Sequence, residues 1–123
     1  MLLPLLSLAL FASPVPESPS LDPTVIQKLV DGLKDPDPDV RQNLASALAK
    51  IGTSSIEPLI VALKDSNSDR RAGAAYTLGL QGEAARAALP TLLELIGDDS
   101  LDVRRQASYA LSRVVPSNPR GGR

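Results

Sequence analysis

The sequence predicts an all-α protein of three consecutive helical hairpins, six helices in total, and three observations support this prediction. First, one phrase occurs three times, beginning at Asp35, Asp65 and Asp98, with an arginine six residues further on in each copy. Second, apolar residues recur at helical spacing before and after each phrase. Third, each phrase opens with a turn rich in Asp, Ser, Asn or Pro. A fixed period of about 30 residues is typical of stacked helical repeats.

The first helix of each hairpin is predicted over residues 23–34, 55–64 and 84–96. Its apolar side chains fall at i, i+3, i+4 and i+7, a spacing that places them on one side of a helix. Pro58 and Pro90 fall in first turns, where the missing N–H of proline costs little. The matching positions predict one buried face used three times: Ile26, Leu29, Val30, Leu33; Ile56, Leu59, Ile60, Leu63; and Leu89, Leu92, Leu93, Ile96.

The second helix of each hairpin is predicted over residues 40–51, 70–80 and 103–114. Its core positions are mostly small, with one constant Leu, so that neighbouring helices can approach closely. These positions are Val40, Leu44, Ala47, Leu48, Ile51; Arg70, Ala74, Thr77, Leu78, Gln81; and Val103, Ala107, Ala110, Leu111, Val114.

Residues at the ends of the second helices carry capping signals. Asp39, Asp69 and Asp102 directly precede these predicted helices, where a carboxylate can accept from free N–H groups and meets the positive end of the helix dipole. Gly52 and Gly82 are predicted to end the first two of them, as glycine commonly does.

The composition excludes several classes of function. The chain has 14 acidic and 13 basic residues, and this balance gives no indication of nucleic-acid binding. It has no His and no Cys, so the commonest general base, the commonest metal ligands and a thiol nucleophile are all missing. Nothing in the pattern buries the Asp side chains of the turns to raise their pKa, as a general acid requires. We therefore predict a chain that is not an enzyme, with no catalytic, cofactor or metal site.

The two ends of the chain differ from the repeats. Residues 1–12 are apolar and uncharged, too short to span a bilayer as a helix and similar to the core of a signal peptide. No Lys or Arg precedes them, and the alternatives are a misplaced start codon or an apolar extension that packs on the domain. Residues 13–22 are predicted to be a Pro/Ser-rich linker, and residues 116–123 a disordered tail. If residues 1–12 act as a signal peptide, the protein is secreted or lies in the periplasm or cell envelope; otherwise it is cytoplasmic.

The repeated phrase also resembles a known family. The segment Leu59 to Asp65 has the pattern Leu-x-x-x-Leu-x-Asp, and Asp39-Val40-Arg41 is followed by an Ala-rich helix that ends Leu-Ala-Lys-Ile-Gly at Gly52. Both halves resemble the HEAT-like repeat, in its short phycobilin-lyase-type form, over residues 23–115. Arg70 and Ser66 depart from the usual Val and Pro, and the last copy lacks its final Gly.

The resemblance implies a right-handed α-solenoid with repeats at about 23–52, 53–82 and 83–115, and with the second helices on its concave side. It also implies a ladder of charges between repeats, formed by Asp35, Asp65 and Asp98 with Arg41, Arg71 and Arg104. The alternative role for these arginines is a row that binds anions.

The concave face of the second helices is the predicted partner-binding surface. Tyr76 and Tyr109 occupy the same position in adjacent repeats, and Tyr is frequent at interface hot spots. The predicted contact residues are Tyr76, Leu80, Arg105, Gln106, Tyr109 and Arg113. The alternative is that both tyrosines only pack between repeats.

These features predict a non-catalytic scaffold or adaptor that binds a protein, with no nucleic acid and no stable membrane span. Neither end has an obvious cap, which allows self-association. The competing prediction, again from the resemblance, is an accessory subunit of an enzyme system such as a phycobilin lyase. Iron-dependent hydroxylases of the wider family hold their metal with His, which this chain lacks.

Overall fold

The computed structural model describes residues 21–118, so the candidate signal segment 1–12, most of the linker and residues 119–123 lie outside the described part. Within residues 21–118 there is no strand, and the six α-helices are α2 (Pro23–Asp31), α3 (Pro38–Ile51), α4 (Ile56–Ala62), α5 (Ser68–Gln81), α6 (Leu89–Leu95) and α7 (Leu101–Val114). The 3₁₀ segments Gly32–Lys34, Gly52–Ser55 and Gly82–Ala88 directly follow α2, α3 and α5, and the last two lead into α4 and α6, so residues 21–118 contain four helical runs without an intervening loop.

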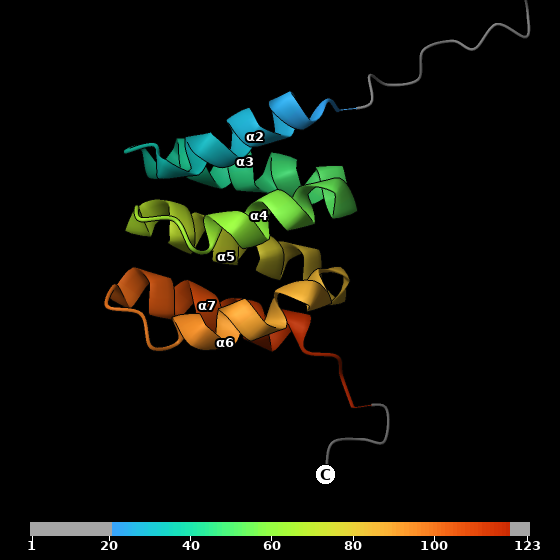
Figure 1. Cartoon of the computed structure of the whole chain (residues 1–123), viewed down its shortest axis with the longest axis vertical. Helices are drawn as coiled ribbons and strands as arrows, with labels where there is room; N and C mark the ends of the chain where they lie inside the picture. Colours follow the sequence, from blue (N-terminus) through green and yellow to red (C-terminus); the bar gives the residue numbers. More distant parts are fainter. Residues whose placement is uncertain (1–20, 119–123) are drawn as a thin grey trace, which may run out of the picture.

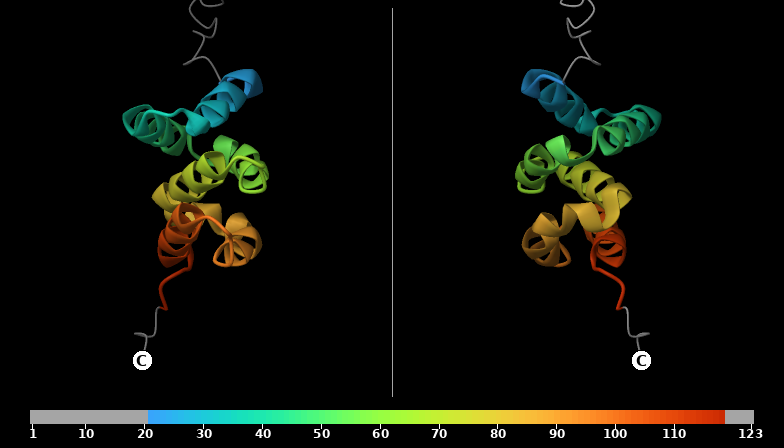
Figure 2. Two further views of the ribbon diagram at one scale, coloured as in Figure 1. Left: turned by 90° about the vertical axis from the view of Figure 1, so that its left-hand side faces the viewer. Right: turned by 90° about the vertical axis from the view of Figure 1, so that its right-hand side faces the viewer.

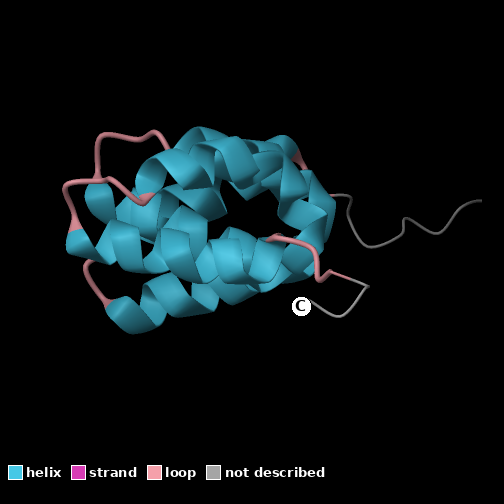
Figure 3. Cartoon of the chain, turned by 90° about the horizontal axis from the view of Figure 1, so that it is seen from below, coloured by secondary structure: helices cyan, strands magenta, loops and turns pink. Residues whose placement is uncertain are grey.

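The helices form three pairs, α2 with α3, α4 with α5, and α6 with α7, stacked along the long axis of the molecule (Figure 1). Seen from the side, α2, α4 and α6 form one layer and α3, α5 and α7 the other (Figure 2). We call these the first-helix layer and the second-helix layer. Within the second-helix layer α5 packs against both α3 and α7. The loops within the pairs gather on one side of the stack (Figure 3). The result is an all-helical, solenoid-like stack of hairpins.

The second helices begin two residues earlier than predicted, at Pro38, Ser68 and Leu101. Their N-caps are therefore Asp37, Asn67 and Ser100, and the prediction that Asp39, Asp69 and Asp102 are caps is wrong. Each observed cap accepts from a backbone N–H of the first turn: Asp39 N at 2.8 Å, Arg70 N at 3.0 Å and Val103 N at 3.3 Å. Asp, Asn and Ser all cap well, so the capping chemistry is kept while its residue type varies. The predicted caps lie in the first turns, near the positive ends of the helices.

The predicted helix ends at Gly52 and Gly82 are confirmed. Their φ angles are +84° and +64°, a region that side chains other than glycine rarely adopt. The helix predicted over 84–96 is only partly α-helical, because Gly82–Ala88 forms a 3₁₀ segment before α6 begins. Ala85 and Ala88 of this segment are fully buried, and the segment contacts both α5 and α7. The tighter turns thus let small residues fill the corner where the chain reverses from α5 to α6.

The core lies between the two layers and contains most of the predicted apolar positions. Six leucines are fully buried: Leu33, Leu48, Leu59, Leu63, Leu78 and Leu92. The predicted face nevertheless fails in the third hairpin, where Leu93 is 55 % exposed and Ile96 is 50 % exposed. Both lie on the side that faces away from the second hairpin, and no following hairpin covers them among residues 21–118. Val40, at the opposite end of the stack, is 37 % exposed for the corresponding reason.

The helical run Pro38–Ala62 has the length and mean hydropathy of a membrane span. It is divided, however, by Gly52 at positive φ and by the 3₁₀ segment that follows. The two α-helices on either side, α3 with 14 residues and α4 with 7 residues, are each shorter than a bilayer-spanning helix. This run is therefore weak evidence for a membrane span.

Candidate binding surface

The repeated phrase folds into the same turn three times. The first Asp of each copy accepts from the backbone N–H two residues later, at 2.8, 2.9 and 2.9 Å for Asp35, Asp65 and Asp98. Nη1 of the following arginine donates to the backbone carbonyl of that same Asp, at 2.6 Å for Arg41, 2.9 Å for Arg71 and 2.8 Å for Arg104. Each arginine therefore fixes the turn of its own repeat, a local role that the ladder prediction did not include.

Only one rung of the predicted ladder is formed among the described residues. Arg71 donates from Nε and Nη2 to the two carboxylate oxygens of Asp98 in the next repeat, at 3.0 and 2.9 Å. The planar guanidinium suits this two-bond geometry, and both side chains are largely buried. Arg41 and Asp65 form no ion pair in the described structure, so the ladder prediction is wrong at this rung.

Arg70 explains the missing rung. It occupies the position that Val40 and Val103 hold in the other two repeats. Its Nη1 donates a hydrogen bond to Oδ1 of Asp65 at 3.0 Å. Its Nη2 forms an ion pair with Asp31 of the first repeat. Arg70 thus joins repeats one and two in place of Arg41 and diverts the carboxylate that the ladder would use. Its Nε is buried and has no hydrogen-bond partner among residues 21–118.

The Arg71–Asp98 rung makes stability depend on pH. The hydrogen bonds from Arg71 hold the pKa of the Asp98 carboxyl below its ordinary value of 3.8. The native state therefore binds this proton less readily than the unfolded chain, so the stabilisation is complete above about pH 5 and is lost as the pH falls through the lowered pKa. We expect Asp98→Asn to lower the free energy of unfolding by about 1–2 kcal/mol at pH 7.

Urea denaturation at pH 7 and at several values below 4 measures this effect. The difference between wild type and Asp98→Asn should shrink as the pH falls below the ordinary Asp pKa. Asp99→Asn, in the same turn but exposed, serves as the control and should change the free energy of unfolding by less than about 0.5 kcal/mol. A loss for Asp98→Asn that is the same at all pH values would contradict the charge-based explanation.

The predicted tyrosine pair is brought together across two repeats. The rings of Tyr76 and Tyr109 stack with their centroids 5.6 Å apart and their planes at 30°. Both side chains are half-buried, and the Tyr109 ring lies over the backbone of Gly79 in α5. The pair thus packs between repeats and leaves part of its surface open to solvent, so a role in binding a partner stays a prediction.

The other predicted contact residues lie on the same layer but differ in exposure. Arg105 and Arg113 are exposed on α7, whereas Gln106 on α7 and Leu80 on α5 are half-buried. Leu80 packs against the core cluster, so it contributes to the fold as well as to the surface.

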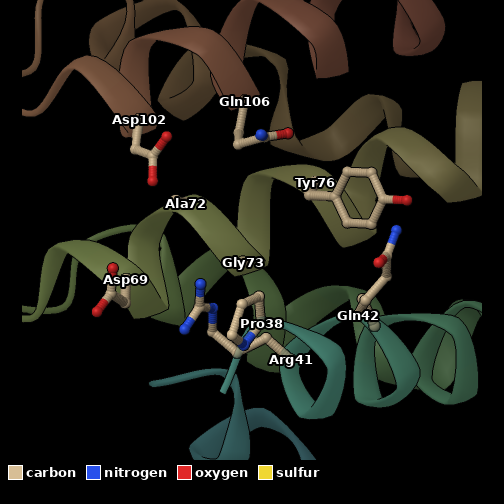
Figure 4. Close-up of a pocket in the computed structure, with 10 residues that line it drawn as sticks. Pro38, Arg41, Gln42, Asp69, Ala72, Gly73, Tyr76, Asp102 and Gln106 are labelled. Carbon is tan, nitrogen blue, oxygen red and sulfur yellow. The ribbon is translucent and has the colours of Figure 1, made fainter. Parts of the chain in front are cut away.

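A hollow of about 190 Å³ lies beside Tyr76 of the pair (Figure 4). It lies between helices of all three repeats, and its lining residues are Pro38, Arg41, Gln42, Ala45, Asp69, Ala72, Gly73, Tyr76, Asp102 and Gln106. Tyr76 and Gln42 lie on one side of it and Asp69 on the other. Ala72 and Gly73 are smaller than the residues at the same positions in α3 and α7, and this small pair leaves the space open.

The prediction identified Tyr76 and Gln106 but missed most of the polar lining. Arg41, Asp69 and Asp102 contribute one positive and two negative charges, and both carboxylates are exposed. The signal that could have located the hollow is the small pair Ala72-Gly73, because the other two repeats have Gln42-Asn43 and Arg105-Gln106 at the same positions. The arrangement can accept N–H donors from a partner side chain beside an aromatic surface.

Comparison with protein families finds a match to the model for HEAT repeats over residues 22–115. The chain belongs to the HEAT repeat family. Comparison with curated proteins gives no match. The match spans all six described helices, so the stacked hairpins of Figure 1 are its HEAT repeats. The tyrosine pair, the hollow and Arg70 are where the three HEAT repeats of this chain differ from one another.

Proposed function

We propose that this HEAT repeat chain is a non-catalytic scaffold that binds a protein partner through its second-helix layer. HEAT repeats generally mediate contacts between proteins, which supports the coarse part of the proposal. The observation that carries the finer part is the stacked pair of Tyr76 and Tyr109 at the edge of the hollow. Half-buried aromatic side chains next to a pocket are typical of interface hot spots.

We also propose that the stack is a right-handed solenoid whose concave side is the second-helix layer. The support is that α3, α5 and α7 pack more extensively against one another than α2, α4 and α6 do. Closer packing in one layer curves a stack of repeats toward that layer. A partner segment would then lie across several repeats at once.

The lining of the hollow favours a partner that donates hydrogen bonds. Asp69 and Asp102 are exposed acceptors, and the amide groups of Gln42 and Gln106 can donate and accept. A Lys or Arg side chain of the partner would meet these carboxylates while its apolar stem lies along Tyr76. The same exposed setting supports a non-catalytic role, because general acid catalysis needs a carboxyl group in a desolvated setting.

Binding through this surface is tested with two matched variants. Tyr76→Ser alters the proposed surface, and Val61→Ser alters an exposed residue of α4 in the other layer. A partner is captured from cells of the natural source, identified by mass spectrometry, purified, and titrated into both variants by calorimetry. We expect Tyr76→Ser to raise the dissociation constant at least about tenfold and Val61→Ser to leave it unchanged.

Circular dichroism checks that both variants remain folded. Undiminished binding by Tyr76→Ser, or equal loss in both variants, would contradict the proposed surface.

A tetrapyrrole or a second HEAT repeat subunit found with the purified protein would instead favour the accessory-subunit alternative. Sequencing of the mature N-terminus tests the proposed export, because an intact Met1 is incompatible with removal of a signal peptide.

A further inference from the structure

The side of each repeat that faces the preceding repeat is its head face. In the third repeat this face consists of Val103, Ala107, Ala110 and Val114, all fully buried. Ala110 meets α5 directly, since a Cβ added to Gly79 would lie 3.1 Å from the Ala110 Cα. In the first repeat the same positions are held by Val40, Leu44, Ala47 and Ile51, all apolar, half-buried or exposed. Leu44 and Ile51 pack in part against the core, and Leu44 meets Gly32 of its own repeat, so among residues 21–118 the face is only partly covered, with Val40 37 % exposed.

The opposite side of each repeat is its tail face. Leu33 of the first repeat meets Gly73 of the second, and both Leu33 and its counterpart Leu63 are fully buried. Their counterpart in the third repeat, Ile96, is 50 % exposed, and Leu93 in the same helix is 55 % exposed. An apolar tail face and an apolar head face are therefore open at the two ends of the described stack.

The α7 part of the open tail face is polar but would tolerate being covered. Ser108 and Ser112 replace the Ala and Gly found at these positions in the earlier repeats. Their Oγ atoms donate to carbonyls of their own helix, Arg105 O at 2.9 Å and Tyr109 O at 2.7 Å. Small side chains whose donors are already bonded allow another helix to approach without leaving an unpaired group.

The charges at the two open ends are complementary. Among the described residues the Asp35 carboxylate accepts only from the backbone N–H of Asp37, and Nε and Nη2 of Arg104 have no acceptor. The formed rung joins Arg71 to Asp98 in a repeat that has Val103 at the position of Arg70. The first repeat likewise has Val40 there, so no arginine diverts Asp35. Arg104 and Asp35 of two copies thus match the pair that forms the rung.

We propose that the chain stacks head to tail with a second copy of itself, reproducing between copies the junction between its second and third repeats. The head face at Val40 covers Leu93 and Ile96 of the other copy, and Arg104 of that copy bonds to Asp35. Such a contact uses different surfaces on the two partners, so it leaves one head and one tail open and continues to longer assemblies. This inference is independent of the partner proposed for the second-helix layer.

The test is the molecular mass of the full chain by sedimentation over about a hundredfold range of concentration, because association follows mass action. We expect the mass to rise with concentration. Val40→Glu and Ile96→Glu should each be monomeric throughout, because each blocks one end. Mixed together, they should form a 1:1 complex and nothing larger, since each still has one open end. Val61→Glu, exposed in the middle of the stack, should associate like wild type.

Two further variants test the geometry of the contact. Arg70 faces Asp31 at the first junction, and Glu94 takes the place of Asp31 in the third repeat. Val40→Arg should therefore keep the association, whereas Val40→Glu opposes Glu94 and abolishes it. Asp35→Asn keeps the turn acceptor but removes the charge, and should raise the dissociation constant about tenfold at low salt. A wild type that is monomeric at every concentration, or association that survives both blocking variants, overturns the proposal.

Discussion

Leu92→Ala is expected to lower the free energy of unfolding by about 2–5 kcal/mol, because it leaves a cavity in a fully buried site. Leu93→Ala, one residue later in α6, is expected to change it by less than about 0.5 kcal/mol, because that side chain is 55 % exposed. The two variants remove the same atoms from the same helix. The difference between them therefore measures burial alone.

Urea denaturation followed by circular dichroism at low protein concentration gives both values. Similar slopes of unfolding free energy against urea would show that the denatured states are comparable. Low concentration keeps self-association from protecting Leu93. Equal losses in the two variants would mean that Leu93 is covered in solution by something outside residues 21–118, and would contradict the exposure on which the comparison depends.

The sequence pattern could not distinguish these two leucines. Periodicity identifies the apolar side of a helix, and both residues lie on it, as their counterparts Leu29 and Val30 do in the first repeat. Whether that side is buried depends on the next hairpin in the stack, which is a property of the assembly of repeats. The same reason explains why Val40 is exposed while its counterpart Val103 is buried.

The details of the charged turns were predictable in type but not in partner. Three copies of the Asp and Arg phrase indicated a repeated structural role, and the repeated turns agree with this. Which carboxylate each arginine reaches depends on a neighbouring residue that differs between repeats. Arg70 binds the Asp65 carboxylate, so among the described residues the Arg41 side chain bonds only to the backbone carbonyl of Asp35 in its own turn. The second helices begin two residues before the predicted starts, because Asp37, Asn67 and Ser100 can cap a helix as well as the Asp residues that follow them.

The candidate surface was predictable where side chains are large and aligned, as with Tyr76 and Tyr109. The hollow beside them depends on side chains that are small. Ala72 and Gly73 carry no chemical signal of their own, and the space they leave is visible only once α3, α5 and α7 are packed together. The polar residues around it come from all three helices.

Gly79→Leu is the second change with a large expected effect, a loss of about 3 kcal/mol in the free energy of unfolding. A Cβ at this position would lie 2.7 and 2.9 Å from two ring atoms of Tyr109 and 3.1 Å from the Cα of Ala110. The ring can move toward solvent, but the backbone of α7 cannot without separating the two helices. Gly79→Ala faces the same contacts, so the gain of about 1 kcal/mol in helix propensity should not appear as added stability.

Ser112→Leu is the matched control, because Ser112 occupies the position of Gly79 in the third repeat and is exposed at the open end. Introducing the same side chain there should change the free energy of unfolding by less than about 0.5 kcal/mol when measured at low concentration. Tyr76 and Tyr109 are the only tyrosines and the chain has no Trp, so near-ultraviolet circular dichroism reports directly on the stacked pair. Gly79→Leu should weaken that signal and Ser112→Leu should retain it. A stable Gly79→Leu variant with an unchanged tyrosine signal would show that α5 and α7 do not approach as closely as the Gly79 contact requires.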